Sequence, residues 1–178
     1  MPQIDAASAG SRNALAFLDT LAVSELGRLA MANSDDGYNI IVGGSQSKPT
    51  LFTNYQDHPR IKVTILDKNG KPKIDARTGK PLQSTAAGRY QILAWIFDSY
   101  RPLLKLPDFS PRSQDLIALR LIRECGAMPD IVAGRTSTAI AKCASRWASL
   151  PGAGYGQHEN SLDLLLDAYR RAGGVIAA

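Results

Sequence analysis

The stretch L-A-V-S-E, Leu21–Glu25, ends a short amphipathic helix and places a carboxylate on its apolar side. The residues spaced three and four positions apart before Glu25 are Leu21, Ala22, Leu18, Leu15 and Ala14. Glu25 therefore shares the face that a helix buries. Burial and the negative end of the helix dipole both raise a carboxyl pKa, and a general acid needs a raised pKa at neutral pH. The alternative is a structural Glu that ends the helix and turns into water.

The composition fits one soluble globular domain over residues 1–178. Hydrophobic residues make up 44% of the 178 residues and charged residues 21%, which is ordinary for such a domain. The net charge of +5 favours an anionic partner, such as nucleic acid, a membrane surface or an acidic wall polymer. The basic residues form no long run or basic helix, so the sequence offers no support for nucleic acid.

The ends of the chain and its cysteines indicate the compartment. The first ten residues, M-P-Q-I-D-A-A-S-A-G, lack the charged and apolar regions of a signal peptide. No apolar run approaches the roughly 18 residues of a membrane span. We therefore expect synthesis as a soluble cytoplasmic chain, with Cys125 and Cys143 as free thiols, although spacing alone leaves a disulfide open. Neither cysteine nor the two histidines shows metal-ligand spacing, so we expect no metal and no cofactor.

The order of sequence patterns predicts an α+β fold. The first part is expected to contain a flexible arm over residues 1–10, a helix over 12–26 capped by Ser11, a loop over 27–36, and strands over 38–42, 50–53 and 61–66. The rest is expected to contain a polar loop or exposed hairpin over 68–81 and helices over 84–100, 111–125, 129–133, 136–149 and 160–172, with Pro102 limiting the first of these. A small antiparallel sheet thus interrupts a mainly helical domain, and a cleft between the two lobes would have Glu25 at its floor.

Two glycine-containing stretches could hold a ligand. The first is S-T-A-A-G-R-Y-Q, Ser84–Gln91, where a helix would place Gly88 beside Gln91 and leave room for a ligand to approach. The second is P-G-A-G-Y-G-Q, Pro151–Gln157, a loop that can hold an aromatic ring and amides against a sugar. The plainer alternatives are a capped helix with an incidental glycine and a simple connector between helices.

Paired-carboxylate chemistry requires a second acid near Glu25. Asp35, Asp36 and Asp57 are the candidates, but each lies in a polar, turn-rich segment and is equally consistent with solvated turn residues. Tyr38, Tyr55, Asp57 and His58 lie in or beside the predicted sheet, where such groups more often form turns. A Ser-His-Asp hydrolase is not indicated, because the G-x-S-x-G turn is missing.

An ordered set of motifs resembles a known family from about Ala14 to Gly174. The motifs are L-A-V-S-E, G-Y-N-I-I-V-G-G, L-F-T-N-Y-Q-D-H-P-R, S-T-A-A-G-R-Y-Q, D-F-S-P-R-S-Q-D and W-A-S-L-P-G-A-G-Y-G-Q. In this order and spacing they resemble the lambda-type endolysins of tailed phages and prophages. The chain differs at Leu26-Gly27, where the family pattern reads S-E-G-T, at Asn39, where it reads G-Y-D, and in a longer segment around residues 68–81.

The resemblance implies a lysozyme-like lytic transglycosylase that lyses the host cell. Such enzymes cleave the β-1,4 bond between N-acetylmuramic acid and N-acetylglucosamine in peptidoglycan and leave a 1,6-anhydro ring. One carboxyl acts first as acid and then as base, and the match assigns that role to Glu25. The implied substrate contacts are Tyr38, Ser84, Gly88, Arg89, Tyr90, Gln91, Tyr155 and Gln157. A hydrolytic muramidase, a non-catalytic wall-binding protein and, more remotely, a basic nucleic-acid binder remain alternatives.

The resemblance also implies how the protein would reach its substrate. The partner would be the glycan strands of peptidoglycan, with release through a membrane hole made by a holin. The protein would be made in the host cytoplasm as a monomer, act in the periplasm, and need no nucleic acid, stable membrane anchor, metal or cofactor.

Overall fold

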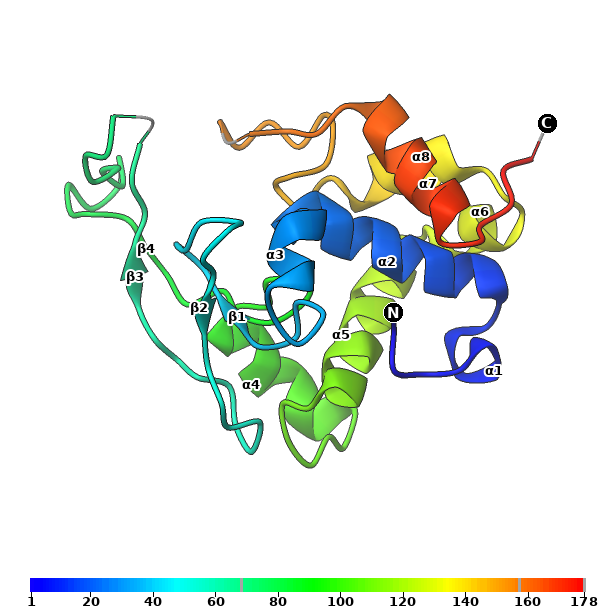
Figure 1. The fold of residues 1–178 in the computed structure, drawn as a ribbon, viewed down its shortest axis with the longest axis horizontal. Helices are drawn as coiled ribbons and strands as arrows, with labels where there is room; N and C mark the ends of the chain where they lie inside the picture. The colour runs from blue at the N-terminus through cyan, green and yellow to red at the C-terminus, as the bar shows by residue number, and fades with distance from the viewer. Residues whose placement is uncertain (68, 157, 178) are drawn as a thin grey trace.

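The computed structural model describes residues 1–67, 69–156 and 158–177, and it shows helices packed around one long helix, with short strands to one side (Figure 1). The helices are α1 (Ala6–Ala9), α2 (Arg12–Leu26), α3 (Arg28–Ala32), α4 (Ala94–Leu103), α5 (Pro111–Glu124), α6 (Met128–Val132), α7 (Thr136–Cys143) and α8 (Leu162–Arg171). The strands are β1 (Ile40–Ile41), β2 (Thr50–Leu51), β3 (Val63–Thr64) and β4 (Gln83–Ser84). The expected α+β architecture is confirmed. Among the described residues, no helix is both long and apolar enough to cross a membrane.

Helix α2 is the centre of the helical part and confirms the helix predicted over residues 12–26. The Ser11 hydroxyl caps it by accepting a hydrogen bond from Ala14 N at 3.0 Å. Gly27 ends it, with a φ of 76° that a residue with a side chain rarely adopts. Between these ends its apolar face packs against α8, α6 and α5, so most of its side chains lie in the core.

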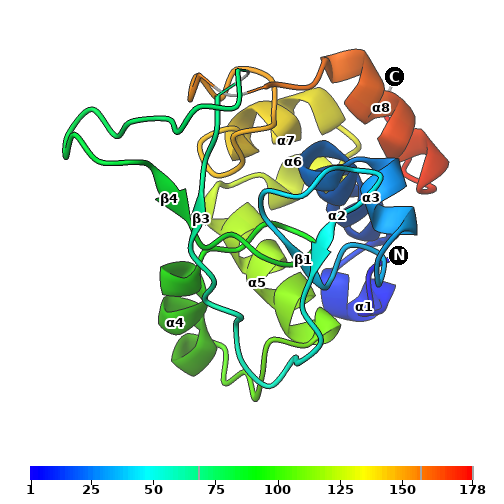
Figure 2. The same cartoon turned by 60° about the vertical axis from the view of Figure 1, so that its left-hand side comes forward.

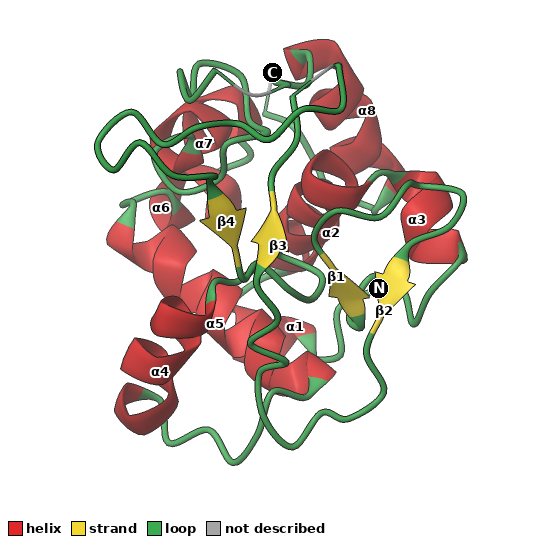
Figure 3. Ribbon diagram, turned by 90° about the vertical axis from the view of Figure 1, so that its left-hand side faces the viewer, coloured by secondary structure: helices red, strands yellow, loops and turns green. Residues whose placement is uncertain are grey.

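The strands form two separate antiparallel pairs that face the viewer in Figure 3. Ile40 lies opposite Leu51 in the first pair, and Val63 lies opposite Ser84 in the second. The strands predicted over 38–42, 50–53 and 61–66 all exist but are shorter, because each backbone leaves its partner after two residues. The chain between β3 and β4 continues as an exposed extension with bridges such as Ile74 to Pro81, although Lys68 lies outside the described residues.

The first ten residues are ordered by contacts with the helical part, so the prediction of a flexible arm over residues 1–10 is wrong. Residues 6–9 form α1, and Ile4 and Ala9 are buried in the core. The backbone amides of Gln3 and Ile4 donate to the Asp115 carboxylate at 2.6 and 3.2 Å. A distant acceptor on α5 thus holds a segment whose own sequence has little preference.

Two further boundaries differ from the prediction. Residues 28–32 form α3 where a loop was expected, because the chain resumes a helix directly after Gly27. Helix α7 ends at Cys143 and not near residue 149, and the following turns bury Trp147, whose indole nitrogen donates to the backbone oxygen of Tyr90 at 3.3 Å. Both Cys125 and Cys143 are free thiols.

The largest error concerns residues 84–100, where only the second half is helical. Helix α4 begins at Ala94, and Pro102 lies inside its last turn instead of limiting it. The preceding residues form a tight turn in which Ala87 and Ile92 exchange backbone hydrogen bonds at 3.0 and 2.8 Å. Gly88 and Gln91 have φ values of 78° and 48°, which a helix cannot contain. Gly88 and Gln91 therefore do not lie on a shared helical face.

Candidate active site

Glu25 lies in the last turn of α2 and lines a cleft of about 530 Å³. The walls come from the end of α2, the start of α3, the segment after β1, the loop after α7, and α8. A smaller hollow of about 210 Å³ shares Glu25, Val42, Gln46 and Gln91 with this cleft and extends along residues 43–49. Glu25 therefore lies where two parts of one groove meet, as the predicted cleft requires.

The extension between β3 and β4 and the loop after α7 approach each other at the top of the view in Figure 2. The extension between β3 and β4 contacts the glycine-rich loop after α7, where Lys73 Nζ donates to the backbone oxygen of Gly156 at 3.4 Å. The loop itself is held by Glu159, whose carboxylate accepts from Gly152 N and Gly154 N, both at 2.8 Å. These contacts connect the strand-bearing part to the loop region of the helical part.

The Glu25 carboxyl has the protonation behaviour of a general acid. Burial raises its pKa from 4.5 to about 7, although hydrogen bonds from the side chain and backbone of Ser149 oppose part of this rise. The carboxyl is therefore partly protonated near neutral pH. A group with a pKa near the working pH can both donate and accept a proton efficiently.

The raised pKa predicts how stability depends on pH. A carboxyl whose pKa is about 7 when folded and 4.5 when unfolded binds more protons in the folded state between these values, so it costs stability as the pH rises through this window. Glu25→Gln is expected to raise the free energy of unfolding by about 3 kcal/mol at pH 8 and to leave it unchanged at pH 4. Urea denaturation at both pH values measures the difference.

Glu159 provides a matched control with the opposite sign. Hydrogen bonds from Gly154 N and Gly152 N lower its pKa, so its charge stabilises the folded state above the ordinary carboxyl range. Glu159→Gln is therefore expected to lower stability at pH 8. An equal change at pH 4 and pH 8 for Glu25→Gln would show that Glu25 has an ordinary pKa.

Gln91 is the predicted contact residue that the structure brings into the cleft with Glu25. Its side-chain nitrogen donates to the backbone oxygen of Gly88 at 3.0 Å, which fixes the side chain against the turn. Gln46 lines both parts of the groove as well and was not predicted. Its side chain lies directly over Gly27, where a Cβ would be 2.5 Å from Gln46 Nε2. A single polar residue in a loop gives no sequence signal for this position.

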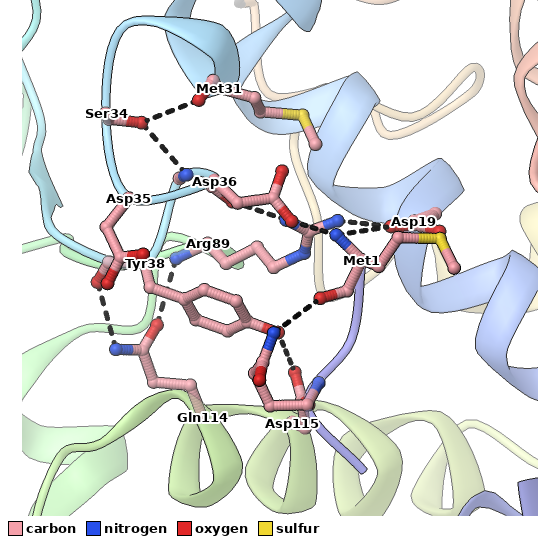
Figure 4. A network of polar contacts seen from close by, with 12 residues as sticks. Met1, Asp19, Met31, Ser34, Asp35, Asp36, Tyr38, Arg89, Gln114 and Asp115 are labelled. Atoms are coloured by element: carbon pink, nitrogen blue, oxygen red, sulfur yellow. Dashed lines mark hydrogen bonds and ion pairs between the residues drawn. The ribbon is translucent and has the colours of Figure 1, made fainter. Parts of the chain in front are cut away.

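Tyr38, Arg89 and Tyr90 are buried, so the prediction that they contact substrate is wrong. Figure 4 shows Tyr38 and Arg89 among the polar side chains that surround them. The hydroxyls of Tyr38 and Tyr90 donate to Asp115 Oδ1 at 2.8 and 2.6 Å. The Arg89 guanidinium forms ion pairs with Asp19 and with Asp36, the latter at 2.6 Å. The ion pairs thus neutralise the buried guanidinium, which would be costly as an unpaired charge, although Arg89 Nε itself has no hydrogen-bond partner among the described residues.

Ser84, Gly88 and Tyr155, the other predicted contacts that the structure describes, are not in the cleft lining. Ser84 lies half-buried in β4, and its hydroxyl accepts from Ala86 N at 3.1 Å. Gly88 packs against the Gln114 side chain, which leaves no space for a Cβ or a ligand. Tyr155 is exposed in the glycine-rich loop, and its hydroxyl donates to the backbone oxygen of Ser145 at 2.9 Å. Gln157 lies outside the described residues.

The carboxylates considered as a second acid are engaged outside the cleft. Asp35 accepts from the Tyr55 hydroxyl at 2.6 Å, and Asp57 pairs with Arg60 at 3.1 Å. Asp36 pairs with Arg89, as described above. None of these three lines the cleft around Glu25 within the described residues.

His58 in the sheet region and Asp167 in the cleft each contact another group of the protein. His58 is buried, and its Nε2 lies 2.9 Å from the backbone oxygen of Ile92. On α8, Asp167 does line the cleft, but it pairs with Arg171 at 2.7 Å.

A polar cluster beneath Glu25 was missed by sequence reasoning. The Ser149 hydroxyl donates to Glu25 Oε1 and lies 2.8 Å from the Ser24 hydroxyl. Asn160 Nδ2 donates to Ser24 O at 2.9 Å and contacts Ser24 Oγ at 3.1 Å. The 124 positions that separate Glu25 from Ser149 explain why no local pattern predicts this contact.

Comparison with known proteins identifies the family. The family model described as Endolysin matches residues 15–176. The endolysin of Escherichia phage P2 is 50% identical over 167 residues, which cover 93% of this chain and 96% of that protein. The endolysin of Escherichia phage lambda is 48% identical over 164 residues, which cover 90% of this chain and 91% of that protein.

Solved structures agree with this match. The lysozyme of bacteriophage lambda in complex with a chitohexasaccharide has a TM-score of 0.77 and 44% identity, covering 99% of this chain and all of that one. A second structure of lysozyme from bacteriophage lambda has a TM-score of 0.73 and 43% identity, with the same coverage. The fold is therefore lysozyme-like, and the chain belongs to the endolysin family.

Proposed function

We propose that this endolysin cleaves the β-1,4 bond between N-acetylmuramic acid and N-acetylglucosamine in peptidoglycan by lytic transglycosylation. The observation that carries the proposal is the Glu25 carboxyl in the groove, with a pKa of about 7. Asp35, Asp36 and Asp57 lie outside the groove, and Asp167 is paired with Arg171. A mechanism in which the sugar itself provides the nucleophile needs only one protein carboxyl.

In this mechanism Glu25 transfers one proton in each direction. The protonated carboxyl first donates its proton to the glycosidic oxygen, and the bond from that oxygen to the anomeric carbon breaks. The C6 hydroxyl of the same muramic acid then attacks the anomeric carbon and gives its proton to the Glu25 carboxylate. The new C–O bond closes the 1,6-anhydro ring and restores the acid without consuming water.

The groove supports a polymeric glycan as the substrate. The similar lambda lysozyme was solved with a chitohexasaccharide, a chain of six sugars. In the present chain Glu25 lines both the cleft of about 530 Å³ and the hollow of about 210 Å³. Sugars on either side of a scissile bond would thus have a place to bind. The net charge of +5 would assist approach to the anionic cell envelope.

The products distinguish this mechanism from hydrolysis. Digestion of purified peptidoglycan is expected to give muropeptides that end in 1,6-anhydro-muramic acid. Each should be lighter than the corresponding hydrolytic product by one water molecule, about 18 Da. Mass spectrometry of the digest measures this difference, and sodium borohydride treatment provides the control, because it reduces only free reducing ends. Reducible muramic acid ends as the main product would establish a hydrolytic muramidase.

The proposed function includes a route to the wall. Residues 1–178 would act as one catalytic domain and as a monomer. The enzyme would be made in the host cytoplasm and released to the periplasm through a holin-type membrane hole, with lysis of the host as the result. Coexpression with and without a membrane-permeabilising protein tests this route, because lysis is expected only when both are present.

A further inference from the structure

A chain of hydrogen bonds connects Glu25 to the loop after α7. The chain runs from Asn160 Nδ2 to Ser24 Oγ at 3.1 Å, then to Ser149 Oγ at 2.8 Å, and then to Glu25 Oε1. Ser24 comes from α2, whereas Ser149 and Asn160 lie in the connection between α7 and α8, on either side of its glycine-rich part. The backbone joins these ends as well, because Asn160 N donates to Ser149 O at 2.8 Å.

Asn160 determines the direction in which these groups donate. Its Nδ2 faces the backbone oxygens of Ser24 and Ser149 at 2.9 and 3.2 Å, and carbonyl oxygens can only accept. The Asn160 amide is therefore the donor toward Ser24 Oγ. The Ser24 hydroxyl can then direct its own hydrogen to Ser149 Oγ, which leaves the Ser149 hydrogen for Glu25.

This direction has a consequence for the two oxygens of Glu25. Oε1 accepts the hydrogen of Ser149, whether the carboxyl is ionised or protonated. The transferable proton of the acid then belongs on Oε2. We propose that Ser149, oriented by Ser24 and Asn160, is a positioning residue that fixes the Glu25 carboxyl in the cleft and leaves Oε2 to carry the proton given to the substrate. This inference rests on the proposed role of Glu25 as general acid.

The other charged or titratable side chains around the cleft do not replace this contact. Arg28 on α3, His158 in the loop and Asp167 on α8 line the same cavity. Within the described residues, none of them forms an ion pair with Glu25. The causes that shift the pKa of Glu25 are burial, which raises it, and the hydrogen bonds of Ser149, which lower it. Removal of the Ser149 hydroxyl therefore acts on Glu25 directly.

The pH dependence of kcat/KM tests the inference. The acid must be protonated in the free enzyme, so the activity on soluble glycan chains should fall above about pH 7 in the unaltered protein. In Ser149→Ala the ionised Glu25 carboxylate loses a hydrogen-bond donor. The alkaline limb of the pH profile, where kcat/KM falls, is therefore expected to move to higher pH by about one unit. At pH 5 the Glu25 carboxyl is protonated in both proteins. There the kcat/KM of Ser149→Ala should be about 10- to 100-fold below that of the unaltered protein, because the carboxyl is no longer held in place.

Three variants separate positioning from folding. Ser149→Thr keeps the hydroxyl and should restore the wild-type limb. Ser24→Ala leaves the Ser149 hydroxyl beside Glu25 but removes the group that orients it. The alkaline limb of this variant should therefore move to higher pH by a smaller amount than in Ser149→Ala. Ser145 is exposed and lies four residues before Ser149. The pH profile of Ser145→Ala should match that of the unaltered protein.

The two proposals fail in different ways. An unshifted limb in a folded Ser149→Ala protein would overturn the role of Ser149, even if Glu25→Gln is inactive. An active Glu25→Gln protein would instead overturn the proposed function. The identity of the product, anhydro or reducing, does not affect the position of the limb.

Discussion

Glu25→Gln is expected to reduce the rate of lysis of outer-membrane-permeabilised cells by about 10⁴-fold, the upper end of the range for a lost general acid–base group. The expectation is large because the proposed mechanism uses the same carboxyl in both steps. A Gln amide can still accept the Ser149 hydrogen through its oxygen, so the side chain should keep its place while losing the proton. The fall in turbidity of a cell suspension measures the rate.

Asp57→Asn is the matched control for this experiment. Asp57 was a candidate second acid in the sequence, but in the structure it pairs with Arg60 at the surface and does not line the cleft. The control should keep nearly full activity, whereas a hydrolytic enzyme that used Asp57 would lose it. Circular dichroism shows whether both variants are folded. More than about a tenth of the activity remaining in folded Glu25→Gln would remove Glu25 from the acid role.

The parts of the fold that the sequence predicts well are those with local causes. Helix α2 has its own cap at Ser11, its own stop at Gly27 and a regular apolar face, so its bounds follow from neighbouring residues. Helix α5 likewise begins at Pro111, directly after Ser110. The turn before α4 was missed because its causes are distant. Gly88 N donates to Ile40 O at 2.8 Å, and Arg89 N donates to Gln114 Oε1 at 3.0 Å.

The same distinction explains the site. The helical period places Glu25 on the apolar side of α2 but left a structural Glu as an alternative, and the ordered motifs of the resemblance assigned it the role of acid. Ser149, which contacts Glu25, and Asn160, which contacts Ser24 and Ser149, could not be predicted, because the packing of α8 against α2 brings them together. Sequence motifs also misassigned Tyr38, Arg89 and Tyr90, since a polar residue within a motif serves a core network as readily as a ligand. The direction of a side chain depends on backbone geometry that the motif does not contain.

Asp115→Ala is expected to destabilise the protein by about 4 kcal/mol, because one buried carboxylate serves four donors. Asp115 accepts from the hydroxyls of Tyr38 and Tyr90 through Oδ1 and from Gln3 N and Ile4 N mainly through Oδ2. Burial raises its pKa, so removing the carboxyl relieves some desolvation cost. Each buried donor left without an acceptor costs about 1–3 kcal/mol, and the sum exceeds that relief.

Asp115→Asn separates the loss of hydrogen bonds from the loss of charge. An Asn can turn its oxygen to Gln3 N and Ile4 N and its amide to the two tyrosine oxygens, which can accept after their hydroxyls rotate. Its cost should be about 1–2 kcal/mol, well below that of Ala. Urea denaturation at pH 7 compares the variants, and proteolysis should cut the first ten residues of Asp115→Ala fastest. If Ala and Asn destabilise equally, charge and not the set of four acceptor contacts is what joins residues 1–10 to α5.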